Sequence, residues 1–178
     1  MPSPPPCPLL PDTETVASWE AFSADAGDLA GRVEGRFRAS GLAFLATLRA
    51  DGSPRASAIE VFFGGGELWL GMMHGSRKAA DLVRDRRLAL HSATTDKQVS
   101  AGDAKLAGHA VDVGDDADAV AAFVAAVQGE NGRPPPEPFH AFKVDVTEVS
   151  LLTVGPGGDH LVIEVWKPGQ AVRRIERR

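Results

Sequence analysis

Residues 42–72 read LAFLATLRADGSPRASAIEVFFGGGELWLGM, and this stretch decides the fold. The apolar run from Leu42 to Ala50 ends at Asp51-Gly52, a dipeptide typical of two-residue hairpin turns. Ser53–Phe63 is the expected return strand, and three consecutive glycines then predict a second tight turn before a third strand, Glu67–Met72. The three strands in series predict an antiparallel meander.

The rest of the chain shows isolated helical segments among further strands. Helices are expected near residues 12–22, 28–39, 76–84 and 115–127, and strands near 87–92, 103–113, 139–154 and 160–166. The regular strand–helix alternation that is typical of parallel sheets is missing. The predicted fold class is therefore mainly β with peripheral helices, arranged as a closed or partly closed antiparallel barrel.

Length and composition indicate a single globular domain. The 178 residues are 43% hydrophobic and 24% charged, which is ordinary for a chain that buries one core. Residues 1–11 carry six prolines and are predicted to form a disordered arm, because proline lacks the amide donor and fixes φ. Residues 12–178 are expected to form one domain.

Charge and cysteine usage argue against several partners and compartments. The formal net charge of -5 offers no basic field for nucleic acid, and no apolar run reaches the length of a membrane span. The N-terminus lacks the pattern of a signal peptide, and the single cysteine, Cys7, cannot form an internal disulfide. We therefore expect a cytoplasmic protein without nucleic-acid or membrane partners.

Residues 71–78, GMMHGSRK, form the best local signal for ligand binding. A strand ends here, a glycine opens the turn, and a helix is expected to begin at Ser76. The first backbone amides of a helix lack helical partners and, together with the helix dipole, can bind an anion. Ser76 adds a hydroxyl, Arg77 a planar fork and Lys78 a compact charge, so the segment predicts a phosphate site.

The same segment also fits a plain helix start with two exposed basic residues. Two cations at a helix N-terminus oppose the dipole, however, and a nearby anion would explain them. Arg55 is a second candidate for the phosphate, since it stands early in the return strand, directly after Pro54. It reaches the same anion if its strand lies beside the Ser76 turn, and is otherwise an exposed strand arginine.

Two blocks, residues 45–55 (LATLRADGSPR) and residues 75–87 (GSRKAADLVRDRR), resemble the pyridoxamine 5′-phosphate oxidase-like FMN-binding split-barrel family. The resemblance covers about residues 37–178. It implies a split antiparallel β-barrel and a homodimer with FMN, or the deazaflavin coenzyme F-420, in a groove between the subunits. Some proteins with this barrel bind haem instead, and a single axial histidine would suffice for that.

The resemblance also implies which residues contact the cofactor. Its phosphate is expected on Arg55, Ser76, Arg77 and Lys78. The backbone of Ala58, Ile59, Gly71 and Met72 is expected to line the isoalloxazine ring, and Ser57 and Met73 are expected among the cofactor contacts.

The chain departs from the true oxidases of this family at two places. Those enzymes carry a lysine where Glu60 stands, and a carboxylate there would repel a phosphate. They also place an Arg-x-His-x-Arg pattern after the last glycine turn, where this chain has the apolar residues Leu161, Ile163 and Val165. These departures argue against activity on pyridoxamine phosphate.

Two functions from different classes are left open by the sequence. One is an FMN- or deazaflavin-dependent oxidoreductase that acts on an unidentified small molecule. The other is a protein that carries a flavin or haem without turnover, for which His74, just before the phosphate turn, is the best-placed histidine. No histidine shows metal-ligand spacing, no metal site is predicted, and no side chain stands out as a catalytic acid or base.

Overall fold

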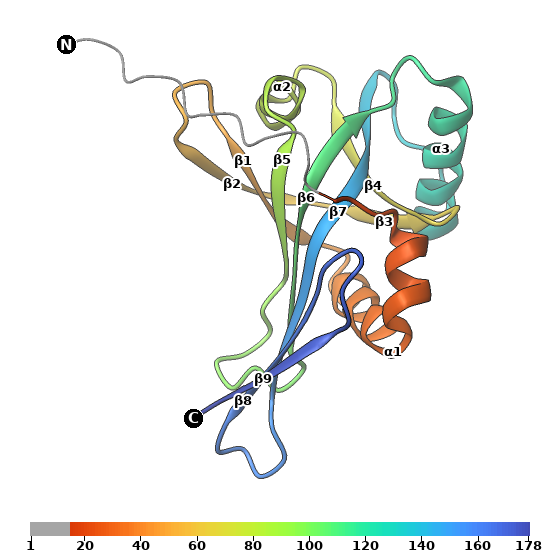
Figure 1. Cartoon of the computed structure of the whole chain (residues 1–178). Helices are drawn as coiled ribbons and strands as arrows, with labels where there is room; N and C mark the ends of the chain where they lie inside the picture. Colours follow the sequence, from red (N-terminus) through yellow and green to blue (C-terminus); the bar gives the residue numbers. More distant parts are fainter. Residues whose placement is uncertain (1–14) are drawn as a thin grey trace, which may run out of the picture.

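The computed structural model describes residues 15–178 and shows a curved antiparallel sheet with three helices around it (Figure 1). The arm predicted for residues 1–11, with Cys7, lies outside the described residues, as does the start of the helix predicted near residues 12–22. No helix within residues 15–178 is long and apolar enough to cross a bilayer.

The elements follow one another in the order that the hydrophobic pattern predicts. The helices are α1 (Trp19–Arg38), α2 (Arg77–Arg84) and α3 (Ala117–Asn131). The strands are β1 (Ala43–Leu48), β2 (Pro54–Ile59), β3 (Val61–Gly64), β4 (Glu67–Met73), β5 (Arg87–Ser92), β6 (Asp103–Asp112), β7 (Phe139–Val154), β8 (Leu161–Trp166) and β9 (Arg173–Arg177).

The sheet runs in the order β2-β1-β5-β6-β7-β4-β3, and all of its pairs are antiparallel. Its two end strands, β2 and β3, are consecutive pieces of one chain segment, residues 54–64. The sheet therefore curls until its ends meet through the chain rather than through a continuous ladder of hydrogen bonds. This arrangement is a split antiparallel barrel, so the predicted mainly β fold class is confirmed.

The predicted return strand Ser53–Phe63 is broken at Glu60, and the simple meander was wrong in this respect. β2 pairs with β1 through the predicted hairpin, whereas β3 pairs with β4 through the glycine turn. The physical reason is that β1 and β4 are the second strands from opposite ends of the sheet path. One segment reaches both only by bending between its halves.

α1 joins the two N-terminal helices that the sequence predicts separately. Ser18 caps it, with Oγ accepting a hydrogen bond from the amide of Ala21 at 3.1 Å. Gly27 has a non-helical backbone (φ 18°, ψ -86°), and it kinks the helix where the prediction placed a break. Apolar residues from both halves, including Phe22 and Val33, are fully buried in the main core.

A second, smaller apolar cluster lies between α3 and the sheet. Phe123 of α3 packs against Phe62 of β3 and Trp69 of β4, and the contact closes over Gly71. Asp116 caps the N-terminus of the helix, while the C-terminus of the helix falls at Gly132 (φ 70°) rather than near the predicted end at residue 127. α3 thereby covers one face of β3 and β4 that the main core does not use.

The two longest strands, β6 and β7, give the barrel its curvature. Their register shifts between Ala107 and Gly108, a β-bulge that bends the pair. A Cβ atom at Gly108 would lie 2.3 Å from the carbonyl oxygen of Asp145, so the close approach requires glycine. The far half of β7 pairs with β8, and β8 pairs with β9, forming an extension that projects from the barrel (Figure 1).

Candidate anion-binding site

α2 begins as the sequence predicts and lies across one end of the barrel, beside the β1–β2 hairpin (Figure 1). Gly75 (φ 73°) turns the chain after β4, and Ser76 takes the N-cap position in an extended conformation. The Ser76 side chain makes no capping hydrogen bond, and the first turn contains no acidic residue. The helix N-terminus therefore presents a hydroxyl and uncapped amides without a carboxylate of its own.

Arg55 is brought to α2 by a buried carboxylate. The Nε atom of Arg55 donates to Asp81 Oδ2 at 2.6 Å, and the hydroxyl of Thr47 on β1 donates to the same oxygen at 2.9 Å. Arg84, one turn after Asp81, lies 3.3 Å from its other oxygen. β1, β2 and α2 therefore meet at Asp81, which is only 4% exposed.

The charge state of Asp81 follows from these partners. Burial alone would raise the pKa of this carboxyl, but hydrogen bonds from Arg55, Thr47 and Arg84 outweigh it, so the pKa lies below its ordinary value. Asp81 is thus a carboxylate at neutral pH and forms a true ion pair with Arg55.

Arg55, Asp81 and Arg84 line an open cavity of about 370 Å³ between the β1–β2 hairpin and α2, here called the arginine cavity. Four arginines and two aspartates line it, which gives a formal charge of +2. The charged lining residues are Arg49, Asp51, Arg55, Arg77, Asp81 and Arg84. The cavity therefore has the size and charge to accept a phosphate group.

Sequence reasoning identified two of these residues and missed the others. Arg55 and Arg77 were predicted, and the cavity brings them together. Arg84 follows Arg77 by two helical turns and so shares its face, a spacing that could have been noticed. Arg49 and Asp81 have no comparable signal, because their role depends on how the hairpin lies over α2.

Lys78 points to the neighbouring strand rather than into this cavity. Its Nζ atom donates to the carbonyl oxygen of Ala58 on β2 at 2.8 Å, and burial lowers the pKa of the Lys78 ammonium. Lys78 therefore joins α2 to the backbone that the sequence assigns to the cofactor ring. Ser76 also lies outside the lining of the arginine cavity, one residue before Arg77.

The other predicted cofactor contacts divide between the two faces of the strands. On β2 the side chain of Ile59 is buried in the core and that of Ala58 is exposed, with Ser57 half-buried. On β4 the side chain of Met72 is buried while Met73 is 78% exposed. These residues remain predictions, and for Ile59 and Met72 only the backbone is placed to meet a ligand.

A second cavity, of about 270 Å³, opens beside β4. Gly71, Met72 and Met73 line it together with Phe123 of α3 and the proline-rich loop after that helix. Glu60 and Arg133 supply its charged groups. This cavity is separate from the arginine cavity, since the two share no lining residue.

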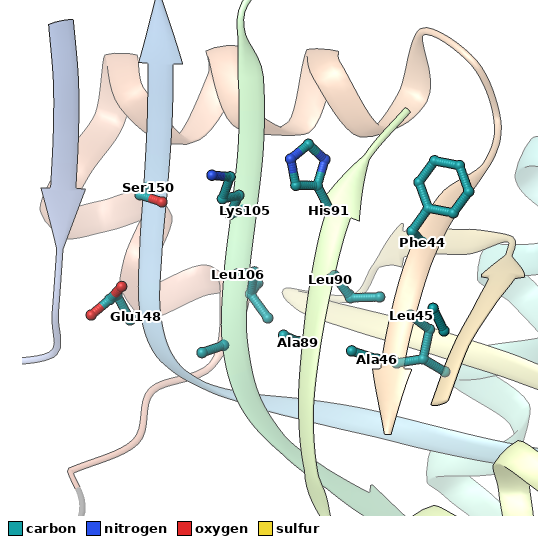
Figure 2. A pocket seen from close by; sticks show the side chains of 12 residues that line it. Phe44, Leu45, Ala46, Ala89, Leu90, His91, Lys105, Leu106, Glu148 and Ser150 are labelled. Atoms are coloured by element: carbon teal, nitrogen blue, oxygen red, sulfur yellow. The ribbon is translucent and has the colours of Figure 1, made fainter. Parts of the chain in front are cut away.

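A third hollow, of about 330 Å³, lies on the outer face of the sheet, with α1 on the opposite side (Figure 2). Phe44 is 52% exposed there, and alanines of β1, β2, β5 and β6 form an apolar floor. His91, Lys105 and Glu148 border it (Figure 2). This exposed apolar strip is a surface on which another molecule could pack.

The histidines form one notable pair. The rings of His74 and His140 stack with centroids 5.4 Å apart and an interplanar angle of 9°, where the end of β4 lies beside β7. Within residues 15–178, no group of three or more histidines, cysteines or acidic residues could hold a metal ion.

Fold and site together define a split-barrel protein with an arginine-lined cavity at one end of the barrel. The family model for pyridoxamine 5′-phosphate oxidase matches residues 29–153, more than half of the chain. The protein belongs to this family, and the resemblance predicted from the sequence is confirmed.

Solved structures of low sequence identity share the fold. An FMN-binding protein related to pyridoxamine 5′-phosphate oxidase from Nostoc punctiforme is 16% identical, with a TM-score of 0.62 over 86% of this chain and 96% of that one. PhzG from Burkholderia lata, solved with tetrahydrophenazine-1-carboxylic acid, is 13% identical, with a TM-score of 0.59 over 96% of this chain and 97% of that one.

A haem-binding protein from Mycobacterium smegmatis is also similar. It is 22% identical, with a TM-score of 0.55, and the match covers 76% of this chain. This chain spans only 57% of that protein's length. No curated protein sequence matches the chain significantly.

Proposed function

We propose that this protein binds a flavin through its phosphate in the arginine cavity and uses it in an oxidoreductase reaction on a small molecule. The observation that carries the proposal is the pairing of Arg55 with Arg77 in one cavity beside an uncapped helix start. Family membership and the FMN-binding protein of Nostoc punctiforme support it.

The residues present fit a flavin phosphate. A phosphate monoester carries a charge of roughly -1.5 to -2 at pH 7, which the formal +2 of the cavity balances. Arg55 and Arg77 would hold the phosphate, and the Ser76 hydroxyl and first amides of α2 would complete the donor set. Lys78 would sit beside the β2 backbone where the ring is expected.

The flavin, when bound, supplies the hydride or electron chemistry, and the protein supplies binding, orientation and exclusion of water. The cavity beside Gly71 is the proposed substrate pocket, because it adjoins the predicted ring contacts. The carboxylate of Glu60 at its edge disfavours a phosphorylated substrate, which supports a reaction other than the oxidation of pyridoxamine phosphate.

We further propose a cytoplasmic homodimer in which the outer sheet face, with Phe44 at its edge, packs against the same face of a second copy (Figure 2). Such a face can pair with a copy of itself, because it has an apolar floor and carries both a lysine and a glutamate at its border, so that each charge can meet an opposite one. β2 takes part in this face through Ala56, so a cofactor on β2 would lie at its margin.

A flavin or haem carrier without turnover is the second candidate. The similarity to the mycobacterial haem-binding protein favours it, and the stacked pair of His74 and His140 offers imidazoles near the start of α2. A carrier needs affinity for its cofactor but no substrate pocket.

The test is a titration of the purified protein with FMN, coenzyme F-420 and haemin, followed by absorbance and fluorescence. Stoichiometric binding of FMN or F-420, weakened by replacing Arg55 and Arg77 with methionine, is the expected result. Binding of haemin alone would favour the carrier, and binding of none of the three would refute the proposal.

A further inference from the structure

Among the described residues, Asp81 is the only charged residue that is buried. It stands on the face of α2 that meets the barrel, three residues after Lys78 and four after Arg77. It also lines the arginine cavity, so an enclosed negative charge borders a site proposed for an anion. A carboxylate at such a place calls for an explanation, because its charge opposes phosphate binding.

The hydrogen bonds of Asp81 give that explanation. Its Oδ2 atom accepts from Arg55 Nε at 2.6 Å and from Thr47 Oγ1 at 2.9 Å. Since Arg55 uses Nε for this bond, its terminal nitrogens keep four N–H donors for another acceptor. Within residues 15–178 the side chain of Arg55 makes no other hydrogen bond.

Thr47 in turn fixes the carboxylate. Its side chain is only 3% exposed, and its hydroxyl approaches the same oxygen as Arg55 does. Thr47 and Arg55 are direct cross-strand partners of β1 and β2, so the strand register sets their spacing. The arginine is therefore held from two sides, by the backbone of β2 and by an immobilised carboxylate.

We propose that Asp81 is a positioning residue that aims the guanidinium of Arg55 into the cavity and so sets a preference for phosphorylated over unphosphorylated flavin. The inference rests on the proposed function of this cavity. Its physical basis is pre-organisation: a long arginine side chain fixed before binding loses less conformational entropy when it contacts the phosphate. The gain from orientation exceeds the repulsion between the carboxylate and the anion.

A purely structural role makes a different prediction. A buried ion pair adds little stability compared with an apolar contact of the same volume, so stabilisation alone gives weak reason for it. If Asp81 only held α2 in place, through Thr47 as well as Arg55, its replacement would weaken FMN binding further even in a variant that lacks the Arg55 guanidinium. If it acts through Arg55, only FMN binding changes, because riboflavin lacks the phosphate.

The experiment measures the affinities of FMN and riboflavin, by fluorescence quenching, for wild type, Asp81→Asn, Arg55→Met and the double variant. We expect Asp81→Asn to weaken FMN binding by about tenfold, the loss of one charge-assisted contact, and to leave riboflavin binding unchanged. In the Arg55→Met background the same substitution should have no further effect on FMN. Asp85→Asn is the matched control, since it removes the ion pair with Arg87 at the other end of α2 and should change neither affinity.

Thr47→Val covers the case in which Asp81→Asn fails to fold. Valine keeps the shape of threonine but removes the hydrogen bond to Asp81, so FMN affinity should fall by about two- to fivefold with riboflavin unaffected. Equal losses for both ligands, or an additive loss in the Arg55→Met background, would overturn the positioning role while leaving the phosphate site intact. A wild type that does not prefer FMN to riboflavin would overturn the proposed function itself.

Discussion

Arg77 and Lys78 are neighbours in the sequence, yet they face different surroundings. Arg77 is exposed and lines the arginine cavity, whereas Lys78 is half-buried and bonds to the carbonyl oxygen of Ala58. An arginine at the cavity contributes to phosphate binding, and a lysine tied to β2 also holds the strand that is proposed to carry the ring. The two residues should therefore have separable effects on cofactor binding.

We expect Arg77→Met to weaken FMN binding by about tenfold and to leave riboflavin binding unchanged, because one charge-assisted contact to the phosphate is lost. Lys78→Met should weaken the binding of both ligands, since the bridge from α2 to β2 is lost as well. Fluorescence titration of the two single variants with both ligands measures this difference. Identical ligand profiles for the two variants would contradict it.

The pH dependence of FMN binding should reveal Lys78. Burial lowers the pKa of its ammonium group. Lys78 therefore loses its proton at a lower pH than an ordinary lysine does. FMN affinity should fall as the pH rises through the lowered pKa, and Lys78→Arg should remove this fall because arginine stays protonated.

The stability of the cofactor-free protein should respond to Lys78 in the opposite direction. The lowered pKa means that the unfolded chain holds more protons than the folded one in this range, so the Lys78 contribution to the free energy of unfolding rises with pH. Urea titrations of wild type and Lys78→Met at pH 8 and 10 measure this contribution. A contribution that falls with pH would show that the ammonium is not desolvated.

At the scale of single residues, the sequence was informative where the motif was local. Ser76, Arg77 and Lys78 belong to one continuous stretch, and Arg55 follows a recognisable hairpin. Asp81 lies in the same helix but looks like an ordinary surface charge in the sequence. Its place in the cavity depends on the docking of the hairpin over α2, which is a tertiary contact that local patterns do not contain.

Among the secondary-structure elements, the close pairing of β6 with β7 depends on a single residue, Gly108. Gly108→Ala would place a Cβ atom against the carbonyl oxygen of Asp145, a backbone atom that cannot rotate away. We expect this substitution to lower the free energy of unfolding by about 1–3 kcal/mol through overpacking. Gly129→Ala is the matched control, because nothing lies within 4 Å of its Cβ position on α3 and alanine favours helix by about 1 kcal/mol.

Urea unfolding of the two glycine variants measures these changes. The expected result is a lower midpoint for Gly108→Ala and an equal or higher midpoint for Gly129→Ala. A midpoint for Gly108→Ala equal to that of wild type would mean that the bulge relaxes to accept the methyl group.

Element boundaries were predictable where periodicity and turn residues agreed. β7 has the predicted limits, 139–154, because buried residues recur along its whole length, with one change of phase at Thr147, and Gly155 follows it. The break at Glu60 could not be predicted, since apolar residues stand on both sides of it and the bend depends on which strands pair. Gly129 suggested too early an end for α3, because a helix tolerates one glycine and the left-handed turn comes only at Gly132.

At the scale of the whole molecule, the exposed apolar surface on the outer face of the sheet is the proposed contact with a second copy of the chain. Phe44→Glu would place a charge at the edge of the proposed contact with a second copy, where an exposed apolar ring now stands. We expect wild type to sediment as a dimer of the 18.7 kDa chain and the variant as a monomer with weaker FMN binding.

Val83→Glu is the control for this substitution. Val83 is also exposed, at 62%, but it lies on α2 rather than on that face, so the variant should remain dimeric. Analytical ultracentrifugation of all three proteins gives the answer, and a monomeric wild type would exclude the homodimer. Self-association was implied by family resemblance only, because no single stretch of sequence shows that Phe44 and distant alanines form one surface.

The bent segment of residues 54–64 also fixes the distance between the arginine cavity and the cavity beside Gly71. Arg55 lines the arginine cavity and Glu60 borders the cavity beside Gly71, and the extended chain between them spans about 16 Å. Inserting or deleting one residue there would turn one of the two side chains to the wrong face. The length of β2 therefore sets the separation of the two charged side chains, and it limits the length of a molecule that could occupy both cavities at once.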